Sequence, residues 1–66
     1  MTNYDKIVFH MERNDPNGEY SVEGIKQYPF VYLDILQAWY YGLKEANEKI
    51  PVWLTFAIKW LDAVTI

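Results

Sequence analysis

A chain of 66 residues that contains no cysteine has few ways to stabilise a fold. A domain of this size buries only about 60% of the surface that its unfolded chain exposes, so small domains commonly rely on disulfides, a structural metal or a second subunit. Without cysteine, disulfides and thiolate metal sites are excluded, and with one histidine a zinc site would have to depend on carboxylates. We therefore expect residues 1–66 to form a single small domain that is stabilised by an apolar core or by oligomerisation.

The composition agrees with a folded, cytoplasmic protein. Apolar residues make up 52% of the chain and aromatic residues 18%, which excludes a disordered tail. The net charge is −3, and no basic patch of the kind that neutralises phosphates is visible, which argues against nucleic acid as a partner. The N-terminus lacks the features of a signal peptide, and the apolar stretch 50–66 is too short to span a membrane. We expect no membrane partner.

The first third of the chain has the pattern of a β-hairpin over residues 3–25. Ile7, Phe9 and Met11 alternate with polar residues, which is the period of a half-buried strand, although Val8 falls on the outward face. The segment 15–18, Asp-Pro-Asn-Gly, predicts a type I turn in which Gly18 takes the left-handed position. The register of the returning strand stays open, because either residue 11 or residue 12 can face residue 22.

Two helices are predicted after the hairpin, over residues 29–50 and 51–64. Pro29 suits the first turn of a helix, the following residues have one apolar face, and Pro51 ends the first helix and begins the second. Gly42 lies at the edge of the apolar face, and we expect it to pack against another backbone. Residues 30–33 could instead form a third strand. The predicted fold is α+β, of the order ββαα, with both helices packed on one face of the hairpin.

The side chains offer little for catalysis. The chain has one serine, Ser21, and one histidine, His10, and no glycine-rich phosphate loop, while its carboxylates are dispersed. We therefore expect no enzymatic activity and no cofactor. His10 could share a strand face with Glu12 and Glu23 and hold a metal, but a solvated polar face explains the same residues, and we predict no metal site.

The C-terminal helix has more apolar surface than one packing partner can cover. Trp53, Phe56, Trp60 and Val64 form one apolar stripe, while Leu54, Ile58 and Leu61 form a second beside it. We interpret the second stripe as a partner interface, together with Tyr40 and Tyr41, because tyrosine is enriched at binding hot spots. In the alternative, the second stripe lies in the core and the tryptophans pack on the preceding helix. The predicted interface residues are Leu54, Ile58, Leu61, Tyr40 and Tyr41.

These features favour a small, non-catalytic protein–protein interaction module or inhibitor. We expect its partner to be a second copy in a homodimer, since twofold dimers are the commonest oligomers, with a larger target protein as a further partner. One alternative is a nucleic-acid-binding regulator that acts as a dimer. The strand and two helices loosely resemble ribbon–helix–helix regulators, although those proteins tend to be basic. A metal-binding or catalytic domain is the other alternative.

Overall fold

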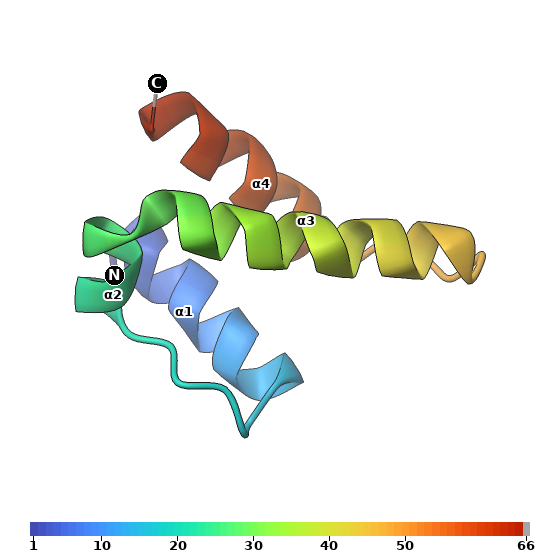
Figure 1. Cartoon of the computed structure of the whole chain (residues 1–66), viewed down its shortest axis with the longest axis horizontal. Helices are drawn as coiled ribbons and strands as arrows, with labels where there is room; N and C mark the ends of the chain where they lie inside the picture. The colour runs from blue at the N-terminus through green and yellow to red at the C-terminus, as the bar shows by residue number, and fades with distance from the viewer. Residues whose placement is uncertain (66) are drawn as a thin grey trace.

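The computed structural model describes residues 1–65, and this part of the chain contains four helices and no strand (Figure 1). The helices are α1 (Asn3–Asn14), α2 (Val22–Gln27), α3 (Pro29–Glu45) and α4 (Val52–Val64). The predicted α+β fold is therefore wrong, because α1 and α2 occupy the segment 3–25 that was assigned to a hairpin. The loose similarity to ribbon–helix–helix regulators disappears with it, since that fold needs a pairing strand.

Helix α1 forms because its apolar residues follow the helical period. Tyr4, Ile7, Val8 and Met11 are spaced three, one and three residues apart, which places them on one face. Ile7, Val8 and Met11 are buried. The alternation that predicted a strand depended on Phe9, whose side chain is 49% exposed on the other side of the helix. Val8, which did not fit a strand, belongs to the core.

A capping box begins α1. The Asp5 amide donates to Thr2 Oγ1 at 3.2 Å, and the Thr2 amide donates to the Asp5 carboxylate at 2.8 Å. This reciprocal pair satisfies amide groups that the first turn leaves without helical partners. The hydrogen bonds from the Thr2 side chain and backbone lower the pKa of Asp5. The cap therefore holds Asp5 in its charged form, as suits the positive end of a helix dipole.

The predicted turn at residues 15–18 is present, but it joins two helices. The Gly18 amide donates to the Asp15 carbonyl at 3.0 Å, as a β-turn requires. The left-handed conformation expected for Gly18 is wrong, since the glycines of the chain have no positive φ angle. Another feature favours glycine at this position: a Cβ atom here would overlap the end of the Tyr20 side chain, which would have to shift. The turn thus closes against an aromatic side chain.

Two tyrosines hold the segment between the turn and α2. The Tyr20 hydroxyl donates to the Asp15 carboxylate at 2.7 Å, and the Tyr32 hydroxyl accepts a hydrogen bond from the Ser21 amide at 3.1 Å. Ser21 then caps α2, because its Oγ accepts from the Gly24 amide at 2.9 Å. These bonds replace the ladder of the predicted hairpin.

Helix α3 begins at Pro29, as predicted, and includes residues 30–33, which excludes the third strand. It ends at Glu45, five residues before the predicted boundary at residue 50. Asn47 has a φ of 56°, the Glu48 amide donates to the Leu43 carbonyl at 2.9 Å, and the Asn47 amide donates to the Lys44 carbonyl at 3.2 Å. This pattern is a Schellman motif, which ends helices at a left-handed residue. Residues 48–50 therefore leave the helix as a connection to α4.

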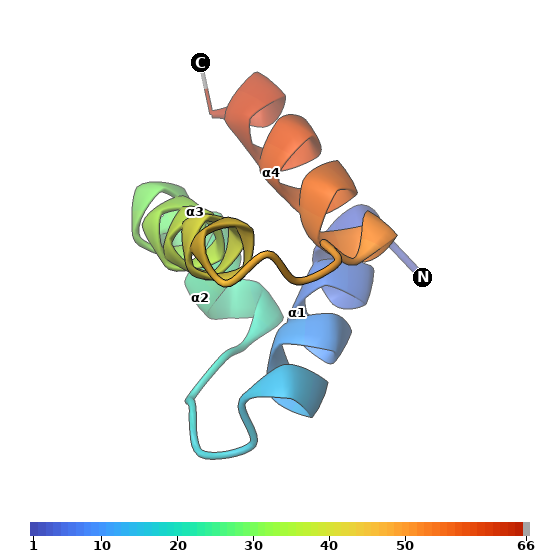
Figure 2. The ribbon, with the colours of Figure 1, turned by 90° about the vertical axis from the view of Figure 1, so that its right-hand side faces the viewer.

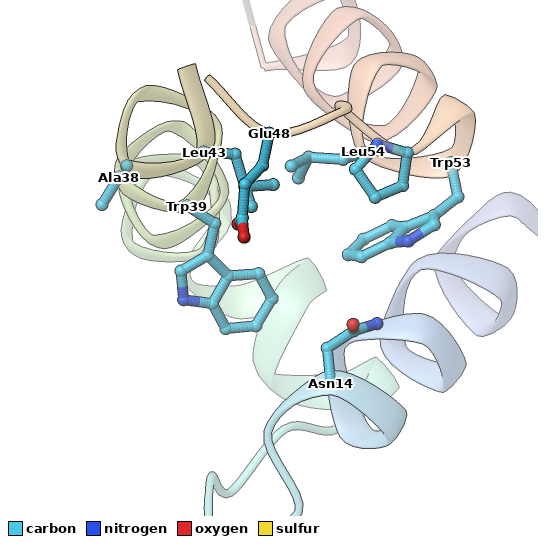
Figure 3. Close-up of a pocket in the computed structure, with 9 residues that line it drawn as sticks. Asn14, Ala38, Trp39, Leu43, Glu48, Trp53 and Leu54 are labelled. Atoms are coloured by element: carbon cyan, nitrogen blue, oxygen red, sulfur yellow. The ribbon is translucent and has the colours of Figure 1, made fainter. Parts of the chain in front are cut away.

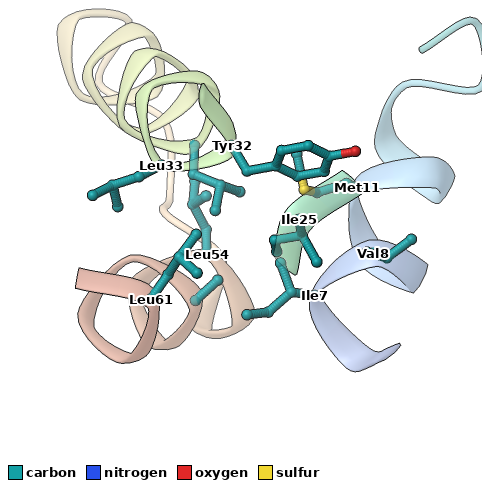
Figure 4. Close-up of a cluster of buried hydrophobic side chains, with 10 residues drawn as sticks. Ile7, Val8, Met11, Ile25, Tyr32, Leu33, Leu54 and Leu61 are labelled. Atoms are coloured by element: carbon teal, nitrogen blue, oxygen red, sulfur yellow. The ribbon is translucent and has the colours of Figure 1, made fainter. Parts of the chain in front are cut away.

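The helices enclose one apolar core (Figure 4). Helix α3 is the longest, and a view along it shows α4 above α1 on one side of α3, with α2 beneath α3 (Figure 2). Every helix contributes to the buried cluster, and Leu36 of α3 has no exposed surface. The cluster consists of Ile7, Val8, Met11, Ile25, Tyr32, Leu33, Leu36, Leu54, Ala57 and Leu61. Within residues 1–65, no helix combines the length and apolar character needed to cross a membrane.

Candidate functional site

Helix α4 (Val52–Val64), predicted over residues 51–64, divides the expected interface stripe between core and surface. Leu54 is 1% exposed and Leu61 is fully buried, and both pack with Ala57 against the other helices. Ile58 is half-buried at the edge of the core. Leu54 and Leu61 therefore belong to the core, as the alternative interpretation of the stripe expected. Ile58 is the one residue of the stripe that a partner could contact.

The tryptophan stripe of α4 packs on α1, the segment that was assigned to the first strand. The imidazole of His10 stacks on the Trp53 indole with 5.0 Å between ring centroids and 9° between planes. Tyr4 meets Trp60 edge-to-face, with centroids 4.8 Å apart. Phe56, which belongs to the same stripe, remains 45% exposed. Helix α1 thus covers the two tryptophans and leaves the phenylalanine between them open to solvent.

Ile58 meets both predicted tyrosines in a shallow depression, which we call the α3–α4 hollow. Its volume is about 200 Å³, and Tyr40 and Tyr41 form one wall with their rings at 90° and centroids 5.4 Å apart. The Tyr41 side chain is 59% exposed. Ile58 and the adjacent pair Tyr40 and Tyr41, which are distant in sequence from it, therefore lie on one surface. The hollow is lined by Gln37, Tyr40, Tyr41, Thr55, Ile58 and Lys59.

A larger cavity, which we call the tryptophan groove, lies between the end of α1, the second half of α3 and the start of α4 (Figure 3). Its volume is about 410 Å³. The indoles of Trp39 and Trp53 face the cavity from opposite sides, with centroids 6.4 Å apart and planes at 78°. The groove is lined by Asn14, Ala38, Trp39, Gly42, Leu43, Glu48, Pro51, Trp53 and Leu54. None of its lining residues apart from Leu54 was predicted as a site residue.

The polar groups that line the groove are hydrogen-bond acceptors on the side facing the cavity. Asn14 donates its amide nitrogen to the His10 carbonyl at 2.8 Å, which leaves its side-chain oxygen toward the groove (Figure 3). Glu48 also lines the groove, and its side chain extends toward Trp39 in the view of Figure 3. The Schellman motif fixes the backbone of Glu48, since its amide is bonded to the end of α3. Glu48 is also the one charged residue among those that line the groove.

Gly42 lies exposed on the wall of the groove. A Cβ atom at this position would have no neighbour within 4 Å. The expected close packing of Gly42 against another backbone is therefore wrong within this chain. Glycine in the interior of a helix costs about 1 kcal/mol relative to alanine, and no intramolecular contact offsets that cost here.

The side chains considered for catalysis and metal binding have structural contacts. Ser21 uses its hydroxyl to cap α2, and His10 stacks on Trp53. The strand face that would have aligned His10 with Glu12 does not exist, because residues 3–14 are helical. Among residues 1–65, no three His, Asp or Glu side chains gather in a way that could hold a metal ion.

One shifted pKa belongs to the loop before α2. Burial, and then the hydrogen bond to Asp15 and its negative charge, raise the pKa of Tyr20 to about 12. The ionised Asp15 accepts from the neutral hydroxyl and disfavours a phenolate beside it. The Tyr20–Asp15 hydrogen bond belongs to the connection between α1 and α2, and Tyr20 lies outside both the hollow and the groove.

Comparison of the chain with models of known protein families, with curated proteins and with solved structures finds no match. A functional conclusion therefore depends on the two depressions that flank α3 and α4. On α3 their residues fall on opposite sides of the buried Leu36, and the two share no lining residue.

Proposed function

We propose that this chain is a non-catalytic protein–protein interaction module that self-associates through the α3–α4 hollow. The observation that carries the proposal is the meeting of Ile58, Tyr40 and Tyr41 on one surface, with Tyr41 59% exposed. Tyrosine is enriched at interface hot spots because it buries a large area with little loss of side-chain entropy. A second copy is the partner we favour, since most oligomers of one chain are twofold dimers.

The size of the chain supports self-association. A domain of 66 residues without disulfides has a small core, and covering half-buried apolar side chains with a second subunit adds burial that the monomer lacks. The hollow is also mixed in character, with an apolar floor at Ile58 and polar groups at Thr55 and Lys59. An apolar centre with a polar rim is the usual anatomy of a protein interface.

The test is the mass of the protein in solution by light scattering over a wide range of concentration. We expect a mass above the 7.9 kDa of one chain, which falls on dilution. Ile58→Glu should remain helical and be monomeric throughout, because an unpaired charge in a dry interface costs several kcal/mol. Val52→Glu is the matched control, since Val52 lies on the same helix, is 83% exposed and lies outside the hollow.

A second variant, Tyr41→Ser, distinguishes loss of the interface from loss of the fold. Tyr41→Ser changes a largely exposed side chain, so it should weaken association without loss of helicity, even if Ile58→Glu unfolds. A constant mass of one chain for the wild-type protein at every concentration would refute self-association. An unchanged dimer in Tyr41→Ser would show that the hollow is not the interface.

A further inference from the structure

The tryptophan groove has a chemical character that the α3–α4 hollow lacks. Its walls are aromatic and aliphatic, from Trp39, Trp53 and Leu43, whereas its one charged group is the Glu48 carboxylate, and the side-chain oxygen of Asn14 also faces it. None of the side-chain hydrogen bonds among residues 1–65 involves Glu48. An occupant that completes this site must bring hydrogen-bond donors and a positive charge on an apolar stem.

We propose that the tryptophan groove binds an arginine side chain presented by a partner polypeptide. A guanidinium group carries its charge on a plane of donors that can pair with a carboxylate through two bonds and stack on an aromatic ring. Trp39 and Trp53 provide the rings, although His10 already covers one face of Trp53, and Glu48 lines the same groove. Cations are attracted to the faces of tryptophan more strongly than to those of other aromatic residues.

The size and openness of the groove also fit a side chain from another protein. A volume of about 410 Å³ accommodates one long side chain with part of its backbone. Gly42 forms part of the wall, and the absence of a Cβ atom there allows a partner backbone to approach the helix. This contact would explain a helical glycine that no contact within the chain requires. The net charge of −3 would favour the approach of a basic partner.

The proposal is independent of self-association, because the groove and the hollow share no lining residue. A phosphate-bearing ligand, such as nucleic acid, is disfavoured by the same carboxylate that attracts a guanidinium. A lysine side chain would bring the charge but not the planar donors. The experiment must therefore compare the binding of arginine with that of lysine, and must distinguish the effect of the charge on binding from the effect of side-chain shape.

The experiment is a titration of the full chain with three blocked peptides that differ at one position, while the indole N–H signals of the tryptophans are followed by NMR. The central residue is arginine, lysine or citrulline, and citrulline has the shape of arginine without its charge. We expect the arginine peptide to shift the signals of Trp39 and Trp53 and to bind most tightly. Trp60 packs on Tyr4 outside the groove, so its signal should not move and serves as an internal control.

The matched variants remove one carboxylate each. Glu48→Gln should weaken arginine binding about tenfold at low salt, since a hydrogen bond to a charged group is worth at least that factor. Glu45→Gln makes the same charge change at an exposed position outside the groove and should bind as the wild-type protein does. Gly42→Leu should remain folded, because the position opens on free space, and should abolish binding by filling the groove.

The outcomes distinguish this proposal from the first. Equal binding of the arginine and citrulline peptides, or unchanged affinity in Glu48→Gln, would overturn the groove proposal whatever the mass of the protein. Equal binding of the lysine peptide would refute the preference for arginine. Arginine binding that persists in Ile58→Glu would support the groove as a separate site, and a wild-type protein that is monomeric would refute the hollow without affecting this result.

Discussion

The region of α1, its loop and α2 is held by a different kind of interaction from the region of α3 and α4. In the first, side-chain hydrogen bonds link successive turns: Thr2 with Asp5, Tyr20 with Asp15, and Ser21 with Gly24. In the second, α3 and α4 begin without a side-chain cap and pack through apolar residues. The comparison suggests that polar contacts specify the path of the N-terminal region, while apolar burial provides the stability of the whole.

The two regions also differ in the surface that they offer to a partner. In the N-terminal region the polar side chains named above are already hydrogen-bonded within the chain. Tyr20 and Tyr32 make two of these bonds, which hold the loop before α2. Helices α3 and α4 retain exposed aromatic side chains and both depressions. A partner would therefore find its contacts on the C-terminal region, with α1 contributing only Asn14 to the groove.

The largest expected effect tests whether apolar burial in the C-terminal region stabilises the whole chain. Leu61→Ala should lower the free energy of unfolding by about 2–5 kcal/mol, because it leaves a cavity at a fully buried position. Val64→Ala, at a position 46% exposed on the same helix, should have little effect. Urea unfolding followed by circular dichroism measures both. Equal effects of the two variants would contradict the position of Leu61 in the core.

A smaller effect tests whether polar contacts specify the N-terminal region. Ser21→Ala removes the cap of α2 and should cost about 1 kcal/mol. Because α2 is short, amide exchange should rise in residues 22–27 and not in α4. Ser21→Asp keeps a cap acceptor and is the control. If amide exchange rose equally in all four helices, the Ser21 cap would support the global fold, and the two regions would not differ in the way described above.

The smallest effect at neutral pH concerns Tyr20, whose pKa is raised from 10.0 to about 12. A group with a raised pKa in the folded state contributes stability that is fully present below pH 10 and is lost as the pH rises through about 12. We therefore expect stability to fall in this range. NMR titration of the tyrosine ring signals should show Tyr20 ionising late, and Asp15→Asn should move its pKa back toward 10. A pKa near 10 in the wild-type protein would show that the loop is open.

The C-terminal region was the more predictable from sequence. Pro29 and Pro51 mark helix starts, and the wheel between them is amphipathic, so both helices were placed within a few residues. The end of α3 was missed because Asn47, rather than glycine, takes the left-handed position. For α1, the strand prediction followed the alternation of Ile7, Phe9 and Met11, whereas the helix follows the spacing of Ile7, Val8 and Met11. Thr2 and Asp5, which form the capping box, are the sequence signal for the start of this helix.

The candidate sites were only partly predictable, because they depend on contacts between distant residues. The tyrosines and Ile58 could be selected by type, since exposed aromatic and apolar residues on helix faces indicate interfaces. The tryptophan groove could not, because Asn14 and Glu48 approach Trp39 only after α1 and the Schellman turn are in place. Gly42 stood out in the sequence, but the contact expected for it was with another backbone of the fold, not with a groove.

The order in which the helices pack has a consequence for the speed of folding. Contacts run from α1 to α2, from α2 to α3 and from α3 to α4, so most partners are neighbours in the sequence. Chains dominated by such local contacts fold in microseconds to milliseconds. The pairing of α1 with α4, through Tyr4 on Trp60 and His10 on Trp53, closes the largest loop in the chain. We expect this closure to come last, so the groove would gain Asn14, its one residue from α1, only in the final step of folding.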